Sequence, residues 1–296
     1  MRTATAMSAL LAAAILLVSC GGGDPEAMGP RPGTAEWHWE GVIENFDSGN
    51  FAKALEHQND VAGRDDPLAE KAVLWRTATL AGLSLGHLEA IDNFNDGITE
   101  KASLEADYAN IIQQLERDGR QYAIELAESL GDVDKAMSGD SVSFEFPFPM
   151  GSPSPSPVMT AIAGGEGAPA NQVSGAIEHT IRRGLIRAAS EIGGFDPDQS
   201  NQAKAKYDAG PVSVPAPKAR RTMAKMLLDI SLLFSRERVN QPDIRKIFIE
   251  RAESWAEPFA ESEDEEEKEW AEQFAKEIED ERRDMERKAR RVGARS

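Results

Sequence analysis

The stretch 36-EWHWEGVIENFDSGNFAKALEHQNDVAGRDDP-67 contains two helical patterns separated by a short break. In the first half, Trp39, Ile43 and Phe46 are spaced i, i+4 and i+7, which places them on one face of an α-helix. Gly49 and Asn50 then interrupt the pattern with residue types that favour turns. A second stripe with helical spacing follows the break: Phe51, Ala54, Leu55, Gln58 and Val61. The stretch therefore predicts a helical hairpin that turns at residues 49–50.

This hairpin resembles a tetratricopeptide repeat, whose turn carries a glycine, then an aromatic residue two positions on, then an alanine three further. Gly49, Phe51 and Ala54 fit that turn. Two weaker copies follow, at Gly86, Leu88 and Ile91, and at Gly131, Val133 and Ala136. The resemblance implies an α-solenoid of helical hairpins over residues 36–138. Because the glycines are spaced more widely than the regular repeat of about 34 residues, a helical bundle without solenoid stacking is the alternative.

The rest of the chain also favours an all-α fold. Runs of alternating Val, Ile, Thr and aromatic residues are scarce, whereas Ala, Glu, Leu, Lys and Arg dominate the periodic segments. Residues 171–260 predict three further core helices. Their inward-facing side chains are expected to be Val173, Ile177, Ile181, Leu185 and Ile192, then Met223, Met226, Leu227, Ile230, Leu233 and Phe234, then Ile244, Ile247, Phe248 and Trp255.

Residues 261–296 predict a long charged helix, with acidic residues first and basic residues last, as the helix dipole favours. A thin apolar seam runs along it: Trp270, Phe274, Ile278 and Met285. We expect this helix to rest on its own domain with its outer face in solvent. The alternatives are that it pairs with a helix of a partner, or that residues 287–295 lie on anionic lipid headgroups.

Between these helical regions, residues 139–170 form a loop rich in Pro, Gly and Ser, which cannot be the interior of a helix. Within it, Phe144, Phe146 and Phe148 alternate and would share one side of an extended chain. We expect this strip to pack against its own helical domain, because exposed apolar strips are uncommon. Insertion into a partner protein or the bilayer is the alternative.

The N-terminus has the form of a secretory signal, with Arg2 followed by an apolar run over residues 4–18. That run is shorter than the roughly 20 residues that span a bilayer. Its end, 17-LVSC-20, resembles in full the lipobox of bacterial lipoproteins. The resemblance implies a signal peptide over residues 1–19, lipid attachment at Cys20, and a flexible tether over residues 20–35. An ordinary signal peptide, or a reduced cytosolic thiol, is the alternative.

The lipoprotein resemblance also bears on location. In that family an aspartate after the cysteine favours retention in the inner membrane, and Gly21 stands there in this chain. The resemblance therefore implies a lipid-anchored protein of the cell envelope, in the outer membrane and facing the periplasm if the cell has two membranes. Cys20 is the only cysteine, so no intramolecular disulfide can form.

Composition and motifs argue against nucleic-acid binding and against an enzyme. The formal net charge of −18 repels nucleic acid. The four histidines are dispersed along the chain, and the zinc-protease motif HExxH is absent from it. Residues 92–103 resemble a calcium loop but carry Phe94 and Ser103 at two ligand positions. We therefore expect no catalytic residues, no cofactor and no metal site.

These observations favour a membrane-tethered scaffold that binds another envelope protein, in envelope assembly or as a transport accessory. The candidate contact residues are those on the inner helices of the clearest hairpin together with the phenylalanine strip: Trp39, Asn45, Asn50, Lys53, Phe144, Phe146 and Phe148. The first alternative is a transport accessory that encloses a small molecule in an apolar pocket. An enzyme built from dispersed acidic residues is a further alternative.

Overall fold

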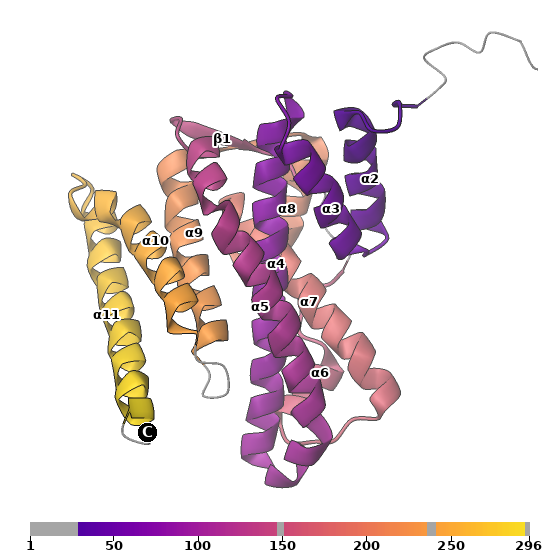
Figure 1. Cartoon of the computed structure of the whole chain (residues 1–296), viewed down its shortest axis with the longest axis vertical. Helices are drawn as coiled ribbons and strands as arrows, with labels where there is room; N and C mark the ends of the chain where they lie inside the picture. The colour runs from indigo at the N-terminus through magenta and orange to yellow at the C-terminus, as the bar shows by residue number, and fades with distance from the viewer. Residues whose placement is uncertain (1–28, 147–150, 236–240, 294–296) are drawn as a thin grey trace, which may run out of the picture.

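A computed structural model describes residues 29–146, 151–235 and 241–293 of the chain. In these ranges ten α-helices make up most of the structure, which confirms the all-α fold class. Figure 1 shows the long helices α4 and α5 at the centre, with α2 and α3 on one side and α9, α10 and α11 on the other. The helices are α2 (Ala35–Asp47), α3 (Phe51–Ala62), α4 (Leu68–Glu100), α5 (Glu105–Ala136), α6 (Pro157–Ala163), α7 (Ala170–Ile192), α8 (Ser200–Ala209), α9 (Ala216–Ser231), α10 (Pro242–Ala260) and α11 (Glu265–Gly293).

The α2–α3 hairpin turns where the sequence predicts. Gly49 has a φ of +79°, a conformation that glycine adopts without steric cost. The Asn50 side chain then caps α3 by accepting a hydrogen bond from the backbone N–H of Lys53. One predicted core residue is wrong, because Val42 is buried and Ile43 is 38% exposed. The buried side chains of α2 are therefore Trp39, Val42 and Phe46, spaced i, i+3 and i+7. The helix is rotated about its axis relative to the predicted orientation.

The predicted turns at Gly86 and Gly131 are wrong, since both residues lie inside long helices, α4 and α5. Gly86 instead allows α4 to touch α7: a Cβ atom on Gly86 would stand 2.6 Å from the Cα atom of Ile181. Gly82 and Gly184 meet at the same contact, and a Cβ on Gly184 would lie 2.4 Å from the backbone oxygen of Gly82. Helical hairpins are present, but α4 is covered by α7, which lies far along the chain.

Two short strands, β1 (Ser141–Phe144) and β2 (Val212–Pro215), pair antiparallel, with Val142 opposite Val214. The sequence predicted a loop at β1, because four alternating residues give too short a signal for a strand. Phe144 and Phe146 are buried, which confirms that this part of the strip packs against its own domain. The ring of Phe146 lies 5.2 Å from that of Phe46. Phe148 lies outside the residues that the structure describes.

The C-terminal part is a layer of three helices: α10 packs along α9, and α11 packs along α10 (Figure 1). All six inward residues predicted for the second of the three core helices, from Met223 to Phe234, are buried, although α9 ends at Ser231 and continues as a short 3-10 helix, η4 (Leu232–Phe234). In α10, Ile247 is 46% exposed, so its predicted inward position is wrong. Phe274 and Ile278 of α11 are buried against the chain itself, as expected.

The described ranges include two more 3-10 helices, η2 (Ala102–Leu104) and η3 (Pro197–Gln199). None of the helices in these ranges combines the length and the apolar character needed to cross a membrane.

Candidate functional site

Most of the aromatic residues predicted to contact a partner lie inside the protein. Trp39 is 9% exposed and packs on Trp75, with ring centroids 4.5 Å apart. The ammonium group of Lys71 lies 4.7 Å above the Trp39 ring. Phe144 and Phe146 are also in the core. These three aromatic side chains therefore hold the fold together and offer no surface to a partner, while Cys20 lies outside the described ranges.

The polar residues predicted for the same role serve the α2–α3 hairpin. The Asn45 side chain donates a hydrogen bond of 2.8 Å to the backbone oxygen of Gly41. Asn50 caps α3, and exposed Lys53 forms an ion pair with Glu56. Asn45, Asn50 and Lys53 thus have local structural partners within the hairpin.

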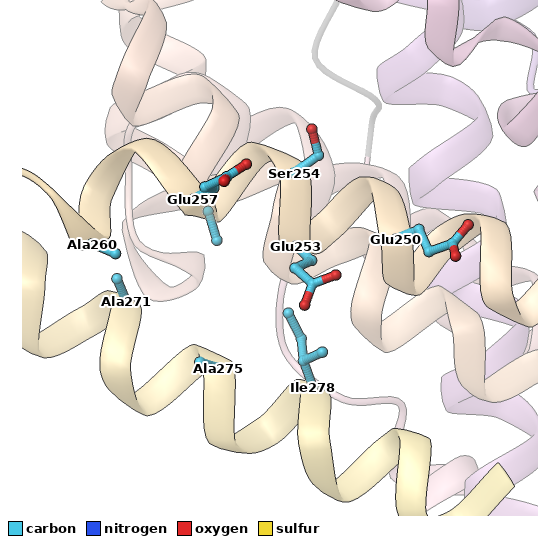
Figure 2. A pocket seen from close by; sticks show the side chains of 9 residues that line it. Glu250, Glu253, Ser254, Glu257, Ala260, Ala271, Ala275 and Ile278 are labelled. Atoms are coloured by element: carbon cyan, nitrogen blue, oxygen red, sulfur yellow. The ribbon is translucent and has the colours of Figure 1, made fainter. Parts of the chain in front are cut away.

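The groove between α10 and α11 is a surface that the sequence did not point to. It has a volume of about 380 Å³. Figure 2 shows Ala260 facing Ala271 across the gap, and Glu253 pointing toward Ile278. Small side chains on both helices leave this space open, whereas larger ones would fill it. The lining residues are Glu250, Glu253, Ser254, Ala256, Glu257, Ala260, Ala271, Ala275 and Ile278.

The groove has an apolar floor and an acidic rim. Ala256, Ala271 and Ile278 are buried at its base, while the glutamates of α10 are exposed. Glu253 accepts a hydrogen bond of 2.9 Å from Arg282 across the groove. At one end, the connection from α10 to α11 and the first residues of α11 add seven acidic residues and one lysine within residues 261–269. The surface thus combines apolar contact area with a strong negative potential.

A buried arginine fixes the distance between the two helices. Arg245 of α10 is 2% exposed and forms ion pairs with Glu281 and Asp284 of α11. Lys288 also contacts Asp284, at 2.9 Å. Partial burial alone would raise the pKa of Asp284, but hydrogen bonds from Lys288 and Arg245 bring that pKa below its usual value. The charged network therefore stabilises α11 on α10 without closing the groove.

The α10 helix is itself held firmly on the central helices. The indole N–H of Trp255 donates a hydrogen bond of 2.6 Å to Asp134 of α5, and Arg251 forms an ion pair with the same carboxylate. Phe248 stacks on Phe234, with ring centroids 5.8 Å apart. These contacts hold α10, which forms one wall of the groove, against the rest of the protein.

Two other cavities are less suited to binding. The apolar cavity beneath the β1–β2 pair measures about 10 Å³, which is the room that a single water molecule needs. An open cleft of about 570 Å³ lies beside α7 and is lined by Arg183 and Arg187. Both arginines are ion-paired, Arg183 with Glu89 and Arg187 with Glu191 and Asp229, which neutralises their charges.

The α2–α3 hairpin brings together two of the histidines that the sequence shows as dispersed. The Nδ1 atoms of His38 and His57 lie 3.1 Å apart, and His38 Nδ1 lies 3.2 Å from a carboxylate oxygen of Asp60. Burial lowers the pKa of His57, and the neighbouring His38 lowers it further. The predicted hairpin already placed both histidines on adjacent helices. They meet because α2 is rotated so that Val42, and not the predicted Ile43, faces inward.

In comparisons with known proteins, no family model, curated protein or solved structure matches this chain. Three features of the chain itself bear on its function: the lipobox-like signal, the acidic groove and the histidine pair.

Proposed function

We propose that this chain is a lipid-anchored scaffold of the cell envelope, attached to the membrane through Cys20 and without enzymatic activity. In a cell with two membranes it would face the periplasm from the outer membrane. The four-residue lipobox match at residues 17–20 supports the anchor. The small and polar residues from 21 to 34 suit a tether, and α2 begins directly after them at Ala35.

We further propose that the α10–α11 groove binds a basic, partly apolar segment of a partner protein. Charge complementarity carries this proposal: the rim and the adjoining turn are rich in glutamate, and a basic segment is attracted to them. The alanine floor accepts apolar side chains, as grooves that receive amphipathic helices do. We therefore propose the α10–α11 groove, and no longer the surface of the α2–α3 hairpin, as the region that contacts a partner.

The alternative of a small-molecule carrier has less support. It requires an enclosed apolar pocket, and ligand pockets typically measure about 300–1,000 Å³. The apolar cavity beneath β1 and β2 measures about 10 Å³.

The anchor is tested by replacing Cys20 with Ala and separating cells into membrane and soluble fractions. We expect the wild-type protein in the membrane fraction and the C20A protein released from it. A Ser19→Ala variant is the matched control, because it leaves the cysteine in place. Membrane retention of C20A, with processing at the same site, would contradict the proposal.

The groove is tested in living cells with a photo-crosslinking residue placed at Ala275, which lines the groove, and at Ala106, which is exposed on α5. We expect a specific adduct from position 275 only. Mass spectrometry should identify the crosslinked peptide as net positive. Changing Glu250 and Glu257 to Lys should abolish the adduct. Equal labelling from position 106, or an acidic crosslinked peptide, would overturn the assignment.

A further inference from the structure

The His38, His57 and Asp60 side chains lie at distances that suit a shared metal ion. One donor atom from each residue lies within 4.8 Å of the other two. The His38–His57 and His38–Asp60 distances are 3.1 and 3.2 Å. Zinc binds nitrogen and oxygen at about 2.0–2.2 Å, so neighbouring ligand atoms of a tetrahedral site are about 3.4 Å apart. Both measured distances are close to that spacing. We propose that these three residues form a Zn²⁺ site that links α2 to α3.

The kind of donor selects the metal. Two imidazole nitrogens and one carboxylate suit zinc and related transition metals, whereas calcium and magnesium require sites made of oxygen. His57 and Asp60 lie three residues apart on α3 and so share one face of that helix, and His38 faces them from α2. Three protein ligands leave a fourth tetrahedral position for water. The Asp60 side chain is 57% exposed, which keeps this side open to solvent.

The neighbouring residues hold both imidazole rings in place. The Trp37 ring meets His38 edge-on at a centroid distance of 4.9 Å, and it meets His57 at 5.6 Å. Gly41 makes room for the second ring, because a Cβ atom there would stand 2.8 Å from His57 Nε2. The His38 side chain is only 12% exposed. Packing therefore restricts the rotamers that both ligands can adopt before a metal binds, which favours affinity.

The proposal is tested with the full chain, purified in detergent without a histidine tag, by titration with Zn²⁺ against a chromophoric chelator. We expect one saturable equivalent and a rise in the unfolding temperature, because a metal that binds the folded state stabilises it. His38→Ala and His57→Ala should each weaken zinc binding about tenfold or more. His179→Ala is the matched control: that residue lies on α7, where its ring contacts the backbone oxygen of Ser154.

A second measurement starts from the wild-type chain, so it does not depend on how well the histidine variants fold. Co²⁺ bound to the wild-type chain should show the visible absorption of a tetrahedral site, and it should quench the fluorescence of Trp37. Trp37→Phe, which keeps an aromatic ring beside both imidazoles, should remove that part of the quenching. Three results would each overturn the proposal: no saturable binding, an equal loss of affinity in His179→Ala, or equal competition by Ca²⁺, which would indicate the acidic surface instead.

Discussion

The α4–α7 contact and the α10–α11 contact join helices in opposite ways. At the first, Gly82 and Gly86 meet Gly184, and the two backbones touch. At the second, the long side chain of Arg245 reaches Glu281 and Asp284, and alanines between the helices leave a groove. Close backbone contact leaves no space for another molecule. Helices held apart by charged side chains keep an open surface, so the molecule has its rigid part at α4–α7 and its candidate binding surface at α10–α11.

The largest effect is expected from adding one methyl group at the backbone contact between α4 and α7. Gly86→Ala places a Cβ atom 2.6 Å from the backbone of Ile181, and neither helix can move away without disturbing the core. We expect the free energy of unfolding to fall by about 3 kcal/mol, the upper range of overpacking effects. Urea denaturation followed by circular dichroism measures this change.

Gly131→Ala is the matched control, because a Cβ at that position has no neighbour within 4 Å. Since Gly131 lies inside α5, alanine should raise the free energy of unfolding by about 0.5–1 kcal/mol. Equal effects of the two substitutions would show that glycine content, and not the contact with α7, determines stability at these positions.

The second prediction concerns the charged contact. Arg245→Ala leaves Glu281 without its arginine partner, and Asp284 keeps only lysine and arginine neighbours on α11. Both carboxylates are partly exposed, so the loss should be smaller than the 3–5 kcal/mol seen for fully buried pairs, about 2 kcal/mol. Limited proteolysis should cut α11 first and leave the α4–α7 region intact. Simultaneous loss of both regions would contradict the comparison.

Acid should distinguish the two regions as well. Burial lowers the pKa of His87 on α4, so between that pKa and 6.5 the unfolded chain binds more protons than the folded one. This contribution to stability is present above pH 6.5 and is lost as the pH falls. Asp284 also has a lowered pKa, and its contribution is present above 3.8 and is lost at more acidic pH. Unfolding by urea from pH 7 to 3 should show the two steps, and His87→Gln should remove part of the first.

The smallest effect is expected at the groove rim. Glu253 and Arg282 form an ion pair in which both side chains are nearly half exposed, and such pairs contribute about 0–1 kcal/mol. Glu253→Gln should therefore leave the urea midpoint nearly unchanged, while partner crosslinking from position 275 should weaken. A stability loss as large as that of Arg245→Ala would show that the rim holds the helices together.

The sequence predicts the helical fold well where one face of a helix is buried. The stripe from Met223 to Phe234 and the seam at Phe274 and Ile278 are buried as expected, because their periodicity reflects burial directly. The turn at Gly49 also follows from residue type. Lipid attachment at Cys20 stays a prediction, since that residue lies outside the described ranges.

Two errors, the predicted turn at Gly86 and the missed groove, arise where one residue type serves two structural purposes. Glycine can end a helix or allow two helices to touch, and the sequence near Gly86 does not say which. The groove was missed because alanines at a helix contact resemble ordinary core alanines. The histidine pair was missed for another reason: the rotation of α2 depends on whether Val42 or Ile43 faces inward, and both are apolar.

The distance along the chain between α4 and α7 has a consequence for how the protein folds. In a solenoid each repeat contacts its neighbours, so structure can form from one end to the other. Here α4 is covered by α7, which lies about a hundred positions later in the chain. Strand β1 likewise can pair only after β2 has been made. A chain that emerges N-terminus first would expose the apolar surface of α4 until α7 arrives. We expect the α4–α7 contact to form slowly, because this long loop must close first, and we expect the exposed surface of α4 to favour aggregation until then.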